Sequence, residues 1–162
     1  GLIDEEKLCF GGNGQKERRF IEPTMLKDVS WDDAVMGEEI FGPILPVLTY
    51  RNLDEALEKI TEQPKPLALY LFTTDKKIEK KVLSKVSFGG GCINDTIIHL
   101  ATPHMGFGGV GESGMGAYHG RLSFDTFTHY KSIVKKRNFI DLPMRYPPYS
   151  EKNTKIIRMF MK

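Results

Sequence analysis

LALYLF at residues 67–72 determines the class of fold, because an unbroken apolar run of this length is typical of a strand buried on both faces. Asp75 follows it in the position of a helix N-cap. Residues 76–86 then place apolar side chains on one side and lysines on the other, as an amphipathic helix does. The sequence therefore predicts a strand followed by a helix.

The same order occurs on the N-terminal side of this unit. The apolar run at 44–50 predicts a second buried strand, and Asn52 caps a predicted helix over 53–60, which ends before Pro64. Because strand and helix alternate along the chain, we expect an α/β fold with a parallel sheet.

Residues 87–95 predict a further strand, but the glycine triplet at 89–91 leaves little side chain to pack, which indicates that the backbone approaches a ligand or another strand closely. Near the N-terminus, residues 7–10 and 19–26 predict two extended segments. The glycines at 11–14 are interpreted as a hairpin turn and not as a phosphate loop, because no helix pattern follows them.

Composition and charge exclude several classes of protein. Lys plus Arg is 23 against 21 for Asp plus Glu, which gives no reason to expect nucleic acid as a partner. No apolar run approaches the roughly 20 residues of a membrane helix. Cys9 and Cys92 lack paired spacing, which favours a reducing compartment, so we expect a cytoplasmic protein. The chain lacks an initiator Met, and we expect it to be a piece of a longer protein.

The motif GEEIFGP at 37–43 contains two adjacent carboxylates and an aromatic residue, followed directly by a Gly-Pro pair. A carboxylate such as Glu39 can accept hydrogen bonds from two neighbouring hydroxyls of a sugar, and Phe41 can pack against a flat ring. The same motif is also explained by an ordinary solvated turn at Glu38 and Glu39, with Phe41 as a core residue. Both interpretations stay open on these residues alone.

Residues 104–120 are too rich in glycine for regular structure. Gly109, Gly111 and Gly114 match a dinucleotide-binding fingerprint, but no strand pattern precedes them and Gly116 and Gly120 interrupt any following helix. The fingerprint interpretation is therefore disfavoured.

These motifs together resemble the aldehyde dehydrogenase superfamily. EEIFGP at 38–43 resembles a motif of that family, and 107–116 resembles its PFGG-x3-SG-x-G segment, with Gly106 in place of the usual proline. The segments 66–70, 116–120, 123–127 and 145–148 are similar to the class 3, fatty or aromatic aldehyde branch. The similarity runs from about residue 11 to residue 148 and places the chain in the C-terminal third of such an enzyme.

The resemblance implies oxidation of aldehydes to carboxylic acids with NAD or NADP, through a cysteine thiohemiacetal. It implies that Glu39 holds the nicotinamide ribose, that Phe41 lies against the nicotinamide, that Phe107 is a wall of the aldehyde tunnel, and that Asn94 lies in the strand leading there.

The nucleophilic cysteine motif of the family lies upstream of EEIFGP and does not occur in this chain. Cys92, with Asn94 and His99 nearby in sequence, resembles part of a Cys/His/Asn device, but a buried strand cysteine is the favoured interpretation. His99, like His104, His119 and His129, has no metal-ligand spacing and is interpreted as a turn or surface residue. We therefore expect no catalytic residue and no metal site here, and no turnover by this chain alone.

The predicted organisation is α/β, a parallel-sheet C-terminal portion of the catalytic domain with a terminal oligomerisation strand. Residues 1–128 belong to the catalytic domain, 129–138 form a bridging strand and 139–162 form a tail. The resemblance implies a homodimer joined across the bridging strand, although a simple edge strand is the alternative.

For the basic and apolar tail, docking on protein or fraying is favoured over a weak membrane anchor. The partners that the resemblance implies are an aldehyde and a missing N-terminal nucleotide-binding half. The alternative function is a non-catalytic α/β binding or dimerisation module.

Overall fold

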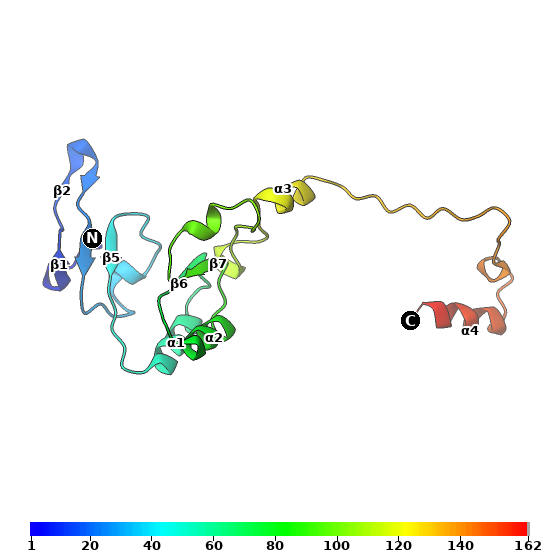
Figure 1. Ribbon diagram of the computed structural model, residues 1–162, viewed down its shortest axis with the longest axis horizontal. Coiled ribbons are helices and arrows are strands. Elements are labelled where there is room, and N and C mark those ends of the chain that lie inside the picture. The colour runs from blue at the N-terminus through cyan, green and yellow to red at the C-terminus, as the bar shows by residue number, and fades with distance from the viewer. Residues whose placement is uncertain (162) are drawn as a thin grey trace. The chain divides into compact units, whose positions relative to one another are not determined.

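The computed structural model describes residues 1–161 of the 162-residue chain (Figure 1). The chain divides into two units, of which the first is Gly1–Ser123 and the second begins at Phe124. In chain order, the strands and helices of the first unit are β1 (Leu8–Phe10), β2 (Gly14–Gln15), β3 (Phe20–Ile21), β4 (Thr24–Leu26), β5 (Ile44–Pro46), α1 (Leu53–Glu62), β6 (Ala68–Leu71), α2 (Lys76–Lys85) and β7 (Gly90–Ile93). The division falls within α3 (Gly120–Thr126), and the second unit carries α4 (Glu151–Phe160).

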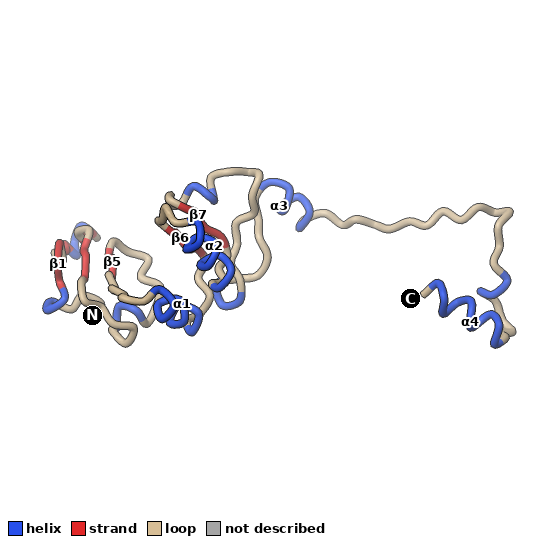
Figure 2. Tube along the Cα trace, turned by 60° about the horizontal axis from the view of Figure 1, so that its bottom comes forward, coloured by secondary structure: helices blue, strands red, loops and turns tan. Residues whose placement is uncertain are grey.

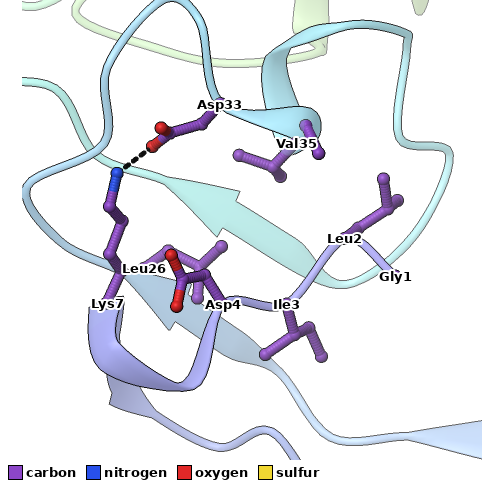
Figure 3. Close-up of a pocket in the computed structure, with 9 residues that line it drawn as sticks. Gly1, Leu2, Ile3, Asp4, Lys7, Leu26, Asp33 and Val35 are labelled. Carbon is purple, nitrogen blue, oxygen red and sulfur yellow. Dashed lines mark hydrogen bonds and ion pairs between the residues drawn. The ribbon is translucent and has the colours of Figure 1, made fainter.

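A three-stranded sheet in the order β1-β4-β5 organises the first part of the chain. Its central strand β4 pairs antiparallel with β1 and parallel with β5. Leu26 of β4 is 1% exposed and packs with Val29 and Val35 in a small apolar core. Beside this core, Lys7 forms an ion pair with Asp33, as Figure 3 shows. The pair joins the start of β1 to the loop that leads toward β5.

The predicted buried strand at 44–50 is shorter and less buried than expected. Only Ile44–Pro46 forms β5, and Leu45 is 56% exposed. β5 is an edge strand, so the backbone on its outer side has no partner strand to which it must donate hydrogen bonds. Pro46, which has no backbone N–H, is therefore tolerated there. Ile44 and Leu48 pack against the core around Leu26, whereas Leu45 faces away from it, so the run contributes only one side to a core.

Helices α1 and α2 form where their capping signals predicted them. Asn52 Oδ1 accepts the N–H of Asp54 at 2.9 Å, and Asp75 Oδ1 accepts the N–H of Lys77 at 2.7 Å. The apolar faces of the two helices meet in a second core, which contains Leu57, Val82 and Val86.

Strand β6 packs on this second core through Leu69 and Leu71, so the two helices cover one face of the β6–β7 pair (Figure 1, Figure 2). The strands are parallel, with Leu69 opposite Gly91. A Cβ on Gly91 would collide with the carbonyl oxygen of Leu69, and one on Gly89 would collide with the carbonyl oxygen of Gly108. The close approach that the glycine triplet indicated is thus made by a neighbouring strand and by the glycine-rich segment.

The fold is mixed α/β. The parallel pairing expected from the strand–helix order is found between β6 and β7. Strand β5 instead pairs in parallel with β4, in a separate sheet within the part of the chain that the structure describes. The antiparallel pairing of β1 with β4 makes the first sheet mixed. Within residues 1–161, the predicted parallel sheet is therefore found only as parallel pairs in separate sheets, and its place in a complete catalytic domain stays a prediction.

In the second unit, residues 128–137 form neither helix nor strand within residues 1–161. The predicted strand at 129–138 is therefore not formed within this chain, and its pairing with a second copy stays a prediction. The tail at 139–161 folds into a 3-10 turn, Pro143–Arg145, and α4, which contact each other. Ser150 caps α4 by accepting the N–H of Asn153 at 3.2 Å. No helix within residues 1–161 has the length and apolar character needed to cross a membrane.

Candidate functional site

A cavity of about 710 Å³ in the first unit gathers residues from distant parts of the sequence. It is lined by Glu39, by residues 64–68 with Tyr70, by Leu100 and Phe107, and by Glu112 and Ser113. We call it the Glu39–Phe107 cavity. Its size is that of a site for a small organic ligand.

Glu39 reaches the cavity because of the residue that follows it. The loop between the 3-10 turn Ala34–Met36 and β5 is anchored by Ile40, which packs against the core around Leu26. An inward side chain at position 40 leaves its neighbours facing away from that core. Glu39 is exposed, so its carboxylate keeps the acceptor sites that two sugar hydroxyls require.

Phe41, the second residue expected at the cofactor, has a different placement. Its side chain is 90% exposed, and it is not among the residues of the first unit that line the cavity. Its backbone φ is 43°, a left-handed conformation that is uncommon for a bulky residue. The alternative expectation that Phe41 fills a core is wrong. Its contact with a nicotinamide stays a prediction.

Phe107 is held in place by both its backbone and its ring. Its N–H donates to the carbonyl of Tyr118 at 2.9 Å, and its carbonyl accepts the N–H of Tyr118 at 3.0 Å. The ring centroid lies 5.7 Å from that of His99, 5.9 Å from that of Tyr118 and 6.0 Å from that of His119. Such distances are typical of favourable aromatic pairs. Phe107 is therefore held in the lining of the cavity, and its contact with an aldehyde stays a prediction.

Glu112, Ser113 and Lys65 are cavity residues that the sequence interpretation missed. Glu112 lies in a 3-10 turn, Gly111–Ser113, and one of its carboxylate oxygens accepts the backbone N–H of Lys65 at 3.3 Å. Hydrogen bonds from its own N–H and from that of Lys65 lower the pKa of Glu112. The Ser113 hydroxyl closes the turn by accepting the N–H of Val110 at 2.9 Å.

The signal for this arrangement was present in the sequence. Glu112 and Ser113 are polar residues inside the segment 104–120, which is too rich in glycine for regular structure. Their partner at position 65 could not be identified without the fold, because the contact joins two segments far apart in sequence.

Asn94, the second residue expected at the substrate, has a structural contact. Its Oδ1 accepts the N–H of Thr73 at 2.8 Å, and its Nδ2 donates to the carbonyl of Thr73 at 2.9 Å. With a φ of 58°, it ends β7 and ties that strand to the end of β6. Asn94 is not among the described residues that line the cavity, and its role toward a substrate stays a prediction.

Cys92 and His99 form a buried contact next to the cavity. Cys92 is 9% exposed on β7, as its interpretation as a strand residue requires, and its Sγ lies 3.6 Å from Nδ1 of His99. His99 lies in a 3-10 turn, Ile98–Leu100, so its interpretation as a turn residue is confirmed, but it is only 6% exposed and the surface interpretation is wrong. His104 and His129 are exposed. Residues 1–161 contain no group of three or more His, Cys, Asp or Glu side chains placed to hold a metal ion.

Comparisons with known proteins give a consistent result. The profile of the aldehyde dehydrogenase family matches residues 3–133. The chain is 54% identical over 155 residues to the 4,4'-diaponeurosporen-aldehyde dehydrogenase of Staphylococcus aureus, covering 96% of the chain and 34% of that protein. It is 48% identical to aldehyde dehydrogenase family 3 member H1 of Arabidopsis thaliana, covering 97% and 33%. It is 47% identical to the dimeric NADP-preferring aldehyde dehydrogenase of Rattus norvegicus, covering 91% and 33%.

Solved structures agree in fold. The substrate-bound state of Staphylococcus aureus AldH superposes with a TM-score of 0.87 at 52% identity, covering 98% of this chain and 34% of that one. A Mycobacterium tuberculosis aldehyde dehydrogenase complexed with NAD+ superposes with a TM-score of 0.71 at 28% identity, covering 83% and 28%. The chain spans about a third of the length of the relatives named above.

Proposed function

The chain belongs to the aldehyde dehydrogenase family, with class 3 members among its relatives, and from this premise we propose that it is the C-terminal part of an NAD- or NADP-dependent enzyme that oxidises aldehydes to carboxylic acids. The family uses NAD or NADP, as a relative named NADP-preferring and a structure complexed with NAD+ illustrate. The bound nicotinamide supplies the acceptor for a hydride.

One observation carries the proposal: Glu39 and Phe107, which are far apart in sequence, line the same cavity. Glu39 offers a carboxylate to the hydroxyls of the nicotinamide ribose, and Phe107 offers an apolar wall to the aldehyde. In this proposal, the hydride donor and the nicotinamide that accepts the hydride meet in the same cavity. An exposed carboxylate at the edge of an apolar cavity fits a sugar, because the sugar brings the hydrogen-bond donors that the carboxylate lacks.

This chain positions the reactants and does not break bonds. Phe41 extends the nicotinamide side, and Asn94 fixes the end of the strand that precedes the substrate side. Neither cysteine lines the Glu39–Phe107 cavity, and the buried Cys92 sulfur contacts His99 instead. The nucleophilic thiolate, which forms the thiohemiacetal, and the nucleotide-binding half are therefore assigned to polypeptide N-terminal to this chain.

Assembly and location follow from the same proposal. Residues 129–138 are proposed to become a strand when two copies of the complete enzyme pair, which would make a homodimer. The Rattus norvegicus relative is named dimeric, which supports this assignment. We place the enzyme in the cytoplasm, since two unpaired cysteines favour a reducing compartment.

The competing function is a non-catalytic binding or dimerisation module on the same scaffold. It is favoured by the absence of a cavity-lining cysteine among the described residues. The deciding experiment measures NAD+- and NADP+-dependent oxidation of aldehydes by the full-length polypeptide that contains this chain. Turnover supports the proposal, and its absence with every aldehyde and both cofactors supports the module.

The chain alone is expected to show no turnover. A matched Cys92→Ala variant serves as the control. Aldehyde oxidation by the isolated chain that disappears in Cys92→Ala would contradict the assignment of the nucleophile to the missing half.

A further inference from the structure

His99 is a buried titratable residue that the proposed function leaves without a role. It lies in the 3-10 turn Ile98–Leu100, which follows β7 after a short loop. Its Nδ1 contacts the Cys92 sulfur at 3.6 Å, whereas its Nε2 is buried and has no hydrogen-bond partner among residues 1–161. A buried polar atom without a partner costs free energy, so another property of the residue must account for its position.

The ring of His99 occupies a space that the backbone leaves open for it. A Cβ on Gly90 would lie 3.1 Å from Cδ2 of His99, tighter than ordinary packing. Two residues of β7 therefore fit the imidazole: Gly90 leaves room for the ring, and the Cys92 sulfur contacts one of the ring nitrogens.

Two aromatic rings that line the Glu39–Phe107 cavity rest on His99. Tyr70 meets it edge to face, with centroids 5.8 Å apart and planes at 66°. Phe107 lies 5.7 Å away, with planes at 55°. His99 is not itself among the described lining residues. It lies behind the wall and touches two of the residues that form it.

We propose that His99 is a positioning residue for the substrate side of the cavity. Its ring supports Phe107 and Tyr70 from behind, and the Cys92 thiol fixes the rotation of the imidazole about its Cβ–Cγ bond. The consequence for catalysis rests on the proposed function, in which Phe107 faces the aldehyde. The positioning itself concerns only this chain and is measurable without turnover.

The variants separate the ring from its nitrogens. His99→Phe keeps an aromatic ring in contact with Phe107, whereas His99→Leu fills similar space without one. His99→Ala removes the support, and Cys92→Ala removes only the sulfur. His104→Ala is the matched control, because His104 is an exposed histidine in the segment between His99 and Phe107.

The first measurement is steady-state kinetics on the full-length polypeptide. Loss of an aromatic contact corresponds to about a three- to ten-fold effect, so His99→Ala and His99→Leu should raise KM for an aromatic aldehyde by about that factor with little change in kcat. His99→Phe should restore KM to within about two-fold of the parent, and His104→Ala should leave it unchanged. Equal kinetics in His99→Phe and His99→Leu would overturn the proposal.

The second measurement does not need activity. With 4-fluorophenylalanine at position 107, the ¹⁹F resonance should shift or broaden in His99→Leu, change less in Cys92→Ala, and stay near its parent position in His99→Phe. Should His99→Ala fail to fold, the contrast between His99→Phe and His99→Leu remains decisive. An unchanged resonance in His99→Leu would refute the positioning role. A shifted resonance in a protein without aldehyde oxidation would retain that role and reject the enzymatic one.

Discussion

Leu69 and Gly91 face each other across the parallel strands β6 and β7 so closely that position 91 has no room for a side chain. The obstacle is the backbone carbonyl of Leu69, which cannot rotate away as a flexible side chain would. The pairing of these strands therefore depends on glycine at position 91.

Gly91→Ala is expected to separate β6 from β7. Overpacking a side chain costs about 1–3 kcal/mol, and a collision with backbone belongs at the upper end of that range. Gly37→Ala is the matched control, because Gly37 has helical backbone angles and the nearest atom to its added Cβ would be 3.4 Å away. Chemical denaturation measures both, and equal midpoints would contradict the prediction.

Leu57→Ala tests the core between α1, α2 and β6. Leu57 is 3% exposed and packs with Val82 and Val86, so its truncation leaves a cavity and should cost about 2–5 kcal/mol. Leu83→Ala, on the same pair of helices, removes a side chain that is 45% exposed and should cost less than about 1 kcal/mol. Urea unfolding compares the two. A larger loss in Leu83→Ala would mean that the core is assigned to the wrong residues.

The Lys7–Asp33 ion pair predicts how stability changes in acid. Hydrogen bonds from Lys7 and from Ser30 lower the pKa of Asp33 from its ordinary 3.8 to about 2. A carboxyl whose pKa is lower in the folded state stabilises the fold above its unfolded pKa, and this contribution is lost as the pH falls from about 3.8 to about 2.

Asp33→Asn should therefore lower the melting temperature at pH 7 and have little effect near pH 2. Asp32→Asn, which removes the same charge from the neighbouring residue, should change the melting temperature less at neutral pH. A destabilisation by Asp33→Asn that is equal at both pH values would show that the carboxylate charge is not its cause.

Glu39→Gln tests the proposed contact with the cofactor. An amide keeps the size of the side chain but replaces one acceptor oxygen, and a hydrogen bond to a charged group is worth about 1.5–3 kcal/mol. In the full-length polypeptide, kcat/KM for NAD+ or NADP+ should fall about ten- to hundred-fold. Glu38→Gln is the control, since Glu38 is not among the described residues that line the cavity. Similar losses in both variants would remove the specific role of Glu39.

Local signals explain what could be predicted from the sequence. Asn52 and Asp75 each cap a helix by accepting the N–H of the residue two positions further along, so the sequence around each cap contains the whole interaction. Glu39 lines the cavity for a similarly local reason, because Ile40, which packs against the core, is its immediate neighbour, whereas its contact with a ribose stays a prediction.

Non-local contacts explain the rest. His99 is buried because Gly90, Tyr70 and Phe107 surround it, and no pattern around position 99 contains that information. Glu112 likewise finds Lys65 only through the fold. Residues 129–138 have a strand-like composition, but backbone hydrogen bonds of a strand need a partner strand, which a sequence pattern does not specify.

The contact of Asn94 with Thr73 has a consequence for amide hydrogen exchange. One carboxamide engages both the N–H and the carbonyl of Thr73, which lies beyond the last residue of β6. Exchange at Thr73 requires this clamp to open, so its amide should be protected like one inside the sheet. Asn94→Ala should release that protection, which would show that the last rung between these two strands is made by a side chain and not by a backbone group.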